Sequence, residues 1–253
     1  MKILPLRKCE FLIHNFLMNS KKISKMICVE ERYWEQRYFT GGTSGPGSVG
    51  VEKAWKWCLI DQFVPVLDQV LDVGCGDLSF WEGRNCVDYV GIDISKTVIE
   101  KNLMKRPTWQ FINANADKRL DGLKKDVVFC LDLLFHIMDT KTFLKILMNL
   151  CYYSTNYICI HTWKNDPFDM KNQIKQLPHY LLNLKPIKAI NALNKLLGTS
   201  KKITDAKYQY FRPLESYLNI FKKYGFNLLI TEENPNKIGA LYIFRKKQRV
   251  KDL

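Results

Sequence analysis

The sequence lacks the features that mark fibrous, disordered and metal-stapled chains. Glycine (13 residues) and proline (9) are not enriched among its 253 residues, and there is no internal repeat or low-complexity tract. The eight cysteines are irregularly spaced without a Cys-x-x-Cys pair, which argues against a zinc site or disulfide framework and for a reducing cytosol. Since 47% of the residues are hydrophobic, the chain can bury the core of one large domain.

Long apolar runs are also missing. The apolar stretch 11–18 near the N-terminus has only eight residues and includes His14 and Asn15. It is too short to span a bilayer, and no small-residue cleavage site follows it, so a secretory signal is a poor alternative. We expect residues 1–29 to be an extension, either a short helix packed on the domain or a frayed end. The protein is expected to be soluble and cytoplasmic.

Segment 70–77 combines an apolar strand, an acid within it and a Gly-x-Gly turn. Only glycine lets a backbone turn so sharply and approach a ligand so closely. The turn predicts a site where a sugar or charged tail meets the free N–H groups of the next helix start. A dinucleotide-binding turn would need Gly or Ala where Ser79 stands, and would not need Asp72 in the strand. For this motif alone, a tight structural turn is the simplest alternative.

Two further acids follow expected strands. Asp93 ends the apolar segment 88–93, and a carboxylate there can accept two charge-strengthened hydrogen bonds from a ribose diol. Asp117 follows the expected strand 109–112, where it can accept the exocyclic amine of an adenine. Acids at successive strand ends therefore predict a nucleoside site.

These motifs, in this order, resemble those of the class I S-adenosylmethionine-dependent methyltransferases. The matching parts are 71–76 for the glycine loop, 91–95 for the ribose acid, Asp117 for the adenine side and 126–132 for the fourth strand. The resemblance extends by strand pattern to 213–246. It implies S-adenosyl-L-methionine as the cofactor, bound by Asp72, Gly74, Cys75, Gly76, Asp93, Ile94, Ala116, Asp117 and Asp132. A dehydrogenase and a non-catalytic Rossmann-like domain are the alternatives.

A glycine-rich stretch, 41–50, follows an aromatic segment that contains Arg37. It looks like the segment that precedes the first strand in a group of small microbial and viral methyltransferases. The resemblance implies that residues 30–50 form a mobile lid whose amides face the methionine carboxylate, with Arg37 as its ionic partner. A flexible linker is the alternative.

Strands and helices alternate along the rest of the chain, which favours a parallel sheet. The helix after the glycine turn must be very short, because Tyr89 follows Gly76 so closely. Further helices are expected at 51–63, 96–106, 140–150 and 213–224, and further strands at 126–131, 157–161, 226–231 and 240–245. The last two strands must be antiparallel, since their connection is too short for a crossover. With the resemblance, the expected fold is α/β: a Rossmann-like, seven-stranded, mostly parallel sheet with a C-terminal antiparallel hairpin and helices on both faces.

The chemistry is expected beyond the fourth strand. Enzymes that methylate adenine or glutamine nitrogens typically carry an Asp/Asn-Pro-Pro-aromatic turn there, and this chain has Asp132-Leu-Leu-Phe-His136 instead. That pattern is similar to the Leu-x-His segment of many small-molecule and glycan methyltransferases. Histidine suits removal of a hydroxyl proton, so His136 and His161 are the candidate bases. Each has a plainer alternative as a helix cap or a pocket wall.

The charge balance leaves the acceptor open. Lys and Arg (39) exceed Asp and Glu (25) by 14, which would suit RNA or an acidic acceptor. The lysines are spread along the chain, however, and an AT-rich genome would also produce them. Residues 164–207 are expected to be a helical, substrate-side insertion studded with lysines, or else a solvated cap.

The sequence thus favours a methyltransferase acting on an unidentified small-molecule or glycan acceptor, at oxygen. Neither a metal nor a membrane partner is expected, and nucleic acid is not the favoured partner. An RNA or protein methyltransferase is the first alternative, and a non-catalytic S-adenosylmethionine- or nucleotide-binding domain is the second.

Overall fold

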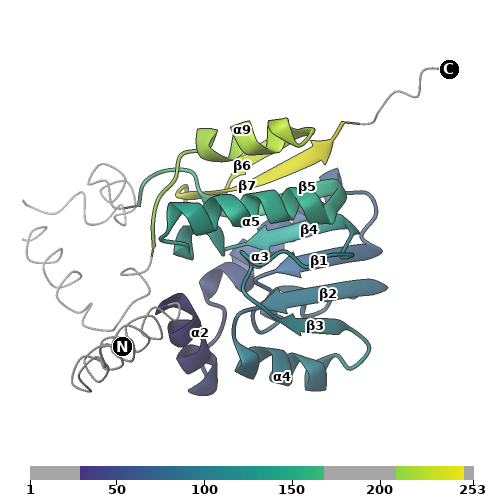
Figure 1. Cartoon of the computed structure of the whole chain (residues 1–253), viewed down its shortest axis with the longest axis vertical. Coiled ribbons are helices and arrows are strands. Elements are labelled where there is room, and N and C mark those ends of the chain that lie inside the picture. Colours follow the sequence, from purple (N-terminus) through teal and green to yellow (C-terminus); the bar gives the residue numbers. More distant parts are fainter. Residues whose placement is uncertain (1–28, 168–208, 248–253) are drawn as a thin grey trace, which may run out of the picture.

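A seven-stranded sheet with the order β3-β2-β1-β4-β5-β7-β6 forms the centre of the molecule (Figure 1). The computed structural model describes residues 29–167 and 209–247. The strands are β1 Gln69–Val73, β2 Asp88–Asp93, β3 Gln110–Asn113, β4 Lys125–Leu131, β5 Ser154–Trp163, β6 Phe226–Glu233 and β7 Gly239–Lys246. The first five are parallel, and β7 runs antiparallel to both β5 and β6. This topology confirms the expected Rossmann-like sheet with its C-terminal hairpin.

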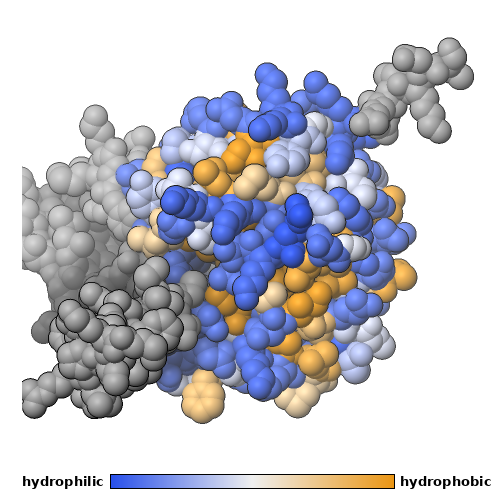
Figure 2. Space-filling model, in the orientation of Figure 1, coloured by the Kyte–Doolittle hydropathy of each residue, from blue (hydrophilic) through white to orange (hydrophobic). Residues whose placement is uncertain are grey.

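Helices cover both faces of the sheet. In Figure 1, α5 (Thr140–Tyr153) and α9 (Glu215–Lys223) lie in front of it and α3 (Gly50–Phe63) lies behind. One core joins the apolar faces of α5 and α9 to the sheet, and a second joins α3 and α4 (Lys96–Lys105) to the other face. Hydrophilic side chains predominate on the described surface seen in Figure 2, between small apolar patches, as amphipathic outer helices require.

Most element boundaries agree with the sequence to within a few residues. Helix α5 extends past Leu150 to Tyr153 because Cys151 and Tyr153 are buried against the sheet. Strand β3 begins after Trp109, whose amide instead closes a turn onto the carbonyl of Arg106 at 3.0 Å. Burial decided the first of these ends and a turn hydrogen bond the second, and the sequence shows both only indirectly.

The glycine turn is followed by only a single 3-10 turn, η2 (Ser79–Trp81), as its short spacing predicted. Two more 3-10 turns, η1 (Pro46–Ser48) and η3 (Leu134–His136), lie in the glycine-rich stretch and after β4. Helix α2 (Val29–Phe39) precedes the glycine-rich stretch and packs on α4. No helix in the described ranges is both long and apolar enough to cross a membrane.

Two expected segments lie outside the described residues. They are the extension at 1–29, apart from Val29, and the insertion at 164–207, apart from 164–167. The division into an extension, a lid, a core domain and an insertion stays an expectation.

Candidate functional site

A cavity of about 560 Å³ opens at the carboxyl ends of the parallel strands, the edge where ligands bind in doubly wound sheets. Strands β1 and β4 are neighbours although the chain visits β2 and β3 between them, so the strand order reverses beside this cavity. Nine residues predicted from the sequence line it: Asp72, Gly74, Cys75, Gly76, Asp93, Ile94, Ala116, Asp132 and His136. Three others, Arg37, Asp117 and His161, are not part of the lining.

The glycine loop sits on the end of β2. Gly74 and Gly76 have φ angles of 81° and 54°, in the left-handed region that favours glycine. The amides of Gly74 and Cys75 donate to the carbonyl of Ile92 at 2.8 and 3.1 Å, and the Gly76 amide donates to Asp93 Oδ2 at 3.0 Å. The loop therefore holds its shape through its own N–H groups. A ligand was expected at free N–H groups of the helix start behind this turn, but a single 3-10 turn stands there and its Ser79 amide donates to Asp77 Oδ1 at 3.0 Å.

Asp93 and Asp72 are buried carboxyls with different partners. Asp93 accepts the amides of Gly76 and Ser95, and burial raises its pKa to about 6. Asp72 Oδ2 accepts the Trp81 indole N–H at 2.8 Å and the Tyr89 hydroxyl at 3.1 Å. Burial also raises the pKa of Asp72 to about 6, with the charge of Asp93 adding to the effect. Two such groups facing one cavity are typical of a functional site.

The glycine-rich stretch covers one side of the cavity. Ser44 and Ser48 line it, together with Trp34 and Tyr38 from α2. The Tyr38 hydroxyl lies 3.1 Å from Ser44 Oγ, and the Trp34 and Tyr38 rings stack with centroids 5.8 Å apart. Parts of 30–50 thus border the cavity, and the mobile lid stays a prediction.

Arg37 holds this lid from outside the cavity. Its Nε donates to the carbonyl of Thr43 at 2.6 Å and its Nη1 to the Tyr33 hydroxyl at 2.9 Å. A Cβ at Gly42 would come within 2.7 Å of the Arg37 side chain. The guanidinium is thus used to fix the turn at 41–43, which corrects its expected position beside a methionine carboxylate.

Asp117 is also displaced from its expected place. It lies in a turn four residues beyond the end of β3, with its carboxylate 3.8 Å from Lys145 Nζ on α5. Ala114, Asn115 and Ala116 line the cavity instead. Asn115, two residues after the end of β3, therefore faces the cavity, and the acid lies in the turn beyond it.

Asp132 lies in the cavity lining and connects β4 to β5 and α3. Its two carboxylate oxygens contact Lys56 Nζ and His161 Nδ1, and its amide donates to the His161 carbonyl at 3.0 Å. Burial alone would raise the pKa of Asp132, but His161 and Lys56 outweigh it and hold that pKa well below its usual range. His161 is buried by this contact, and its Nε2 faces Gly239. His161 therefore supports Asp132 and does not reach the cavity.

His136 is the histidine that the structure brings into the cavity. It ends η3, with its amide bonded to the Leu133 carbonyl at 2.9 Å. Its ring meets Trp34 edge to face at 5.1 Å and Phe135 at 4.5 Å. Only 5% of the residue is exposed, so the imidazole has one fixed place in the wall.

The sequence analysis missed several residues of the site: Glu30, Trp34, Tyr38, Ser44, Ser48, Asn115, Asp139 and, behind the wall, Lys56. Trp34 and Tyr38 belong to the aromatic segment before the glycines, so their place could have been inferred. Lys56 gave a weaker signal, as a lysine one helical turn before Ile60 on the face of α3 that packs on the sheet.

The cavity fits a nucleoside that carries a cationic group. Asp93 is a buried carboxyl at the end of β2, where a sugar diol would lie. Five carboxylate side chains, Glu30, Asp72, Asp93, Asp132 and Asp139, belong to the lining, whereas no lysine or arginine of the described residues does. A cavity lined by carboxylates favours a positively charged ligand. Among the described residues, no group of three His, Cys, Asp or Glu side chains could hold a metal ion.

Comparison with known proteins also indicates a methyltransferase domain. Residues 71–151 match the sequence model of the methyltransferase domain family. No curated protein matches the chain significantly.

Several solved structures share the fold. The magnesium protoporphyrin IX methyltransferase of Synechocystis, crystallised with S-adenosylhomocysteine, is 17% identical with a TM-score of 0.52 and covers 80% of this chain and 90% of its own. The N-methyltransferase NodS of Bradyrhizobium japonicum is 10% identical with a TM-score of 0.56, covering 87% and 99%. An S-adenosylmethionine-dependent methyltransferase of Clostridium acetobutylicum is 12% identical with a TM-score of 0.53, covering 80% and 94%.

The domain match spans the glycine loop, Asp93 and β4, and the likeness in fold extends over most of the chain. Residues 71–151 are therefore similar to the methyltransferase domain family, and the chain has the fold of solved methyltransferases that bind S-adenosylmethionine or its product.

Proposed function

We propose that the protein transfers a methyl group from S-adenosylmethionine to an oxygen of a small-molecule or glycan acceptor, with His136 as the general base. The observation that carries this proposal is the position of His136 in the cavity wall, just after β4, beside Leu133 and Ile137. This wall lacks the proline-rich turn that holds planar amines. A cavity of about 560 Å³ is in the range usual for small ligands.

Each part of the site has a distinct task in this proposal. Asp93 accepts the ribose hydroxyls, and the backbone around Gly74 and Gly76 lets the nucleoside approach. Ser44 and Ser48 close the cavity against water. When bound, S-adenosylmethionine supplies an activated sulfonium methyl, so positioning alone contributes much of the rate. His136 orients the acceptor hydroxyl and takes its proton as the oxygen is methylated.

The charges of the cavity bear on the acceptor. The chain carries a net charge of +14, but among the described residues the lining holds five carboxyl side chains and no lysine or arginine. The lysines of the described residues are therefore not gathered at this cavity, which favours a neutral acceptor over RNA or a phosphorylated compound.

Labelled-methyl transfer into fractionated cell extract tests the proposal. We expect label in a small-molecule or glycan fraction, released by treatments that cleave methyl ethers or esters and not by nuclease or protease. Label in RNA or protein would contradict it in favour of an RNA or protein methyltransferase. Tight S-adenosylmethionine binding without transfer into any fraction would favour a non-catalytic domain.

A further inference from the structure

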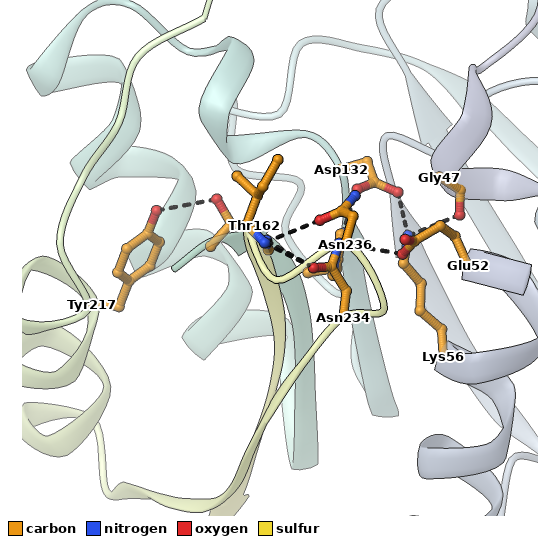
Figure 3. A network of polar contacts seen from close by, with 11 residues as sticks. Gly47, Glu52, Lys56, Asp132, Thr162, Tyr217, Asn234 and Asn236 are labelled. Carbon is orange, nitrogen blue, oxygen red and sulfur yellow. Dashed lines mark hydrogen bonds and ion pairs between the residues drawn. The ribbon is translucent and has the colours of Figure 1, made fainter. Parts of the chain in front are cut away.

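Lys56 is a buried cation that no step of methyl transfer requires. It lies in the middle of α3 with none of its side chain exposed. A buried ammonium is costly unless it is paired and hydrogen-bonded. Lys56 Nζ forms an ion pair with the Asp132 carboxylate and donates a hydrogen bond to the Gly47 carbonyl at 2.9 Å. Figure 3 shows these two contacts at the tip of the Lys56 side chain.

These partners come from different parts of the site. Gly47 lies in η1, between the two lid serines that line the cavity. Asp132 directly follows β4 and lines the same cavity from below. One ammonium group therefore links the glycine-rich stretch, at Gly47, to Asp132 at the end of β4.

The fit at this junction is tight. A Cβ built on Gly47 would lie 2.4 Å from Asp132 Oδ2 and 2.9 Å from its Cγ, which is closer than atoms can approach. The lid can reach the Asp132 carboxylate only because residue 47 has no side chain. The lid is thus seated on Asp132 itself, and Lys56 bridges the two.

Asp132 is held in an uncommon backbone conformation. Its φ is 60°, in the left-handed region that costs a non-glycine residue energy and persists only where neighbouring groups fix it. Lys56 fixes one carboxylate oxygen, and His161 fixes the other oxygen and the amide. This conformation sets the direction in which the chain continues to Leu133 and His136.

We propose that Lys56 is a positioning residue that couples closure of the lid at 44–48 to the conformation of the chain after β4. It acts through Asp132 and Gly47 and does not touch the cofactor. The cofactor cavity is then closed at two points, by Ser44 on the glycine loop and by Gly47 on the Lys56–Asp132 pair. Loss of Lys56 opens the second point, so the protein binds S-adenosylhomocysteine less tightly and the lid amides exchange faster.

The test compares variants of the full chain by calorimetry with S-adenosylhomocysteine and by hydrogen–deuterium exchange. For Lys56→Met we expect an affinity lower by roughly tenfold or more and faster exchange in peptides covering 41–50, with exchange in β1 and β2 unchanged. Lys53→Met is the matched control. It lies one turn earlier on α3 and donates to the carbonyls of Ser79 and Glu82 at 2.9 and 2.8 Å, so it should change neither readout.

Gly47→Ala keeps the proposal testable if Lys56→Met does not fold. This variant leaves Lys56 in place and removes only the space that the lid needs over Asp132, and it should reproduce both effects. Wild-type affinity and exchange in Gly47→Ala would overturn the proposal. Weaker binding with unchanged exchange at 41–50 would also overturn it, because Lys56 and Gly47 would then act without the lid. Neither readout needs an acceptor, so failure of the proposed methyl acceptor leaves this test intact.

Discussion

Ser44 and Asp77 hold each other across 33 positions of sequence through three hydrogen bonds. The Ser44 amide donates to Asp77 Oδ2 at 3.1 Å, the Ser44 hydroxyl donates to Asp77 Oδ1 at 2.8 Å, and the Asp77 amide donates to Ser44 Oγ at 2.9 Å. Burial alone would raise the pKa of Asp77, but hydrogen bonds from Ser79 and Ser44 outweigh it and lower the pKa. The lid and the glycine loop are therefore one hydrogen-bonded unit over the cavity.

Substitution of Gly76 tests this unit. Its φ is +54°, and a Cβ there would lie 2.1 Å from Ser44 Oγ. Gly76→Ala should displace Ser44, so that affinity for S-adenosylhomocysteine falls by roughly tenfold or more. Stability should also fall, by about 1–2 kcal/mol for the left-handed backbone alone. Calorimetry and urea unfolding measure the two effects.

Gly83→Ala separates strain from steric clash. Gly83 has a similar φ of +78°, but an added Cβ would meet nothing within 4 Å. It should lose a similar stability from strain while binding S-adenosylhomocysteine like the wild type. Equal affinities in the two variants would show that Ser44 does not depend on the space at Gly76.

The sequence predicted the strand ends well and the loops beyond them poorly. Gly74, Gly76 and Asp93 were found because strand patterns fix which residues reach one edge of a parallel sheet. Asp117 was misplaced because the turn after β3 directs it toward Lys145, and the path of a turn depends on contacts that a strand pattern does not contain.

Lys56 could not have been assigned from the sequence, for a different reason. Its partner Asp132 lies 76 positions away, on an element that packs beside α3 only in the folded sheet. Helical spacing could have indicated that Lys56 faces the core, but not which charge would meet it there. Arg37 was misplaced for a similar reason, since it donates to the carbonyl of Thr43 and to the hydroxyl of Tyr33.

Cofactor affinity should depend on pH through Asp93. The folded pKa of Asp93 is about 6, above the ordinary value of about 4, and in the proposed complex only the ionised form would accept both ribose hydroxyls. Affinity for S-adenosylhomocysteine should therefore rise by roughly tenfold between pH 5 and 7 and then level off. The same shift makes the contribution of Asp93 to folding stability fall as pH rises from about 4 to 6.

Two variants identify the titrating group. Asp93→Asn should bind more weakly and lose the rise in affinity. Asp72→Asn should keep the rise, since an amide oxygen can still accept from Trp81 and Tyr89. Calorimetry at half-unit pH steps measures both, and a rise that survives in Asp93→Asn would assign the titration to another group.

Glu35 fastens α2 to the start of α4. It accepts the Ser95 hydroxyl at 2.6 Å, the Thr97 amide at 3.2 Å and the Thr97 hydroxyl. Glu35→Gln should lower the free energy of unfolding by about 1 kcal/mol, as loss of a helix cap does. Burial raises the pKa of Glu35, but the hydrogen bonds from Ser95 and Thr97 outweigh it and lower that pKa. The contribution of Glu35 to folding stability is therefore present above about pH 4.3 and is lost as pH falls below that.

Glu100→Gln is the control for this prediction. Glu100 pairs with Lys96 at 3.5 Å on the exposed face of the same helix, and such pairs contribute little. Its loss should change the unfolding free energy by less than about 0.5 kcal/mol. If urea unfolding gives equal losses for the two variants, the contact between α2 and α4 does not depend on Glu35.

The two histidines beyond β4 and on β5 should respond differently to substitution by asparagine. His136 lines the cavity, so His136→Asn should lower kcat by about 10²–10⁴-fold and leave the affinity for S-adenosylhomocysteine nearly unchanged. His161 reaches the cavity only through Asp132, so His161→Asn should weaken cofactor binding and stability more than the chemical step.

The pH dependence of kcat separates the two histidines, because a base must be neutral to act. The fall in kcat at low pH should disappear in His136→Asn and remain in His161→Asn. A fall at low pH that persists in His136→Asn, with kcat near the wild-type value, would mean that the hydroxyl proton leaves without this imidazole and that the cavity works by orientation of the acceptor alone.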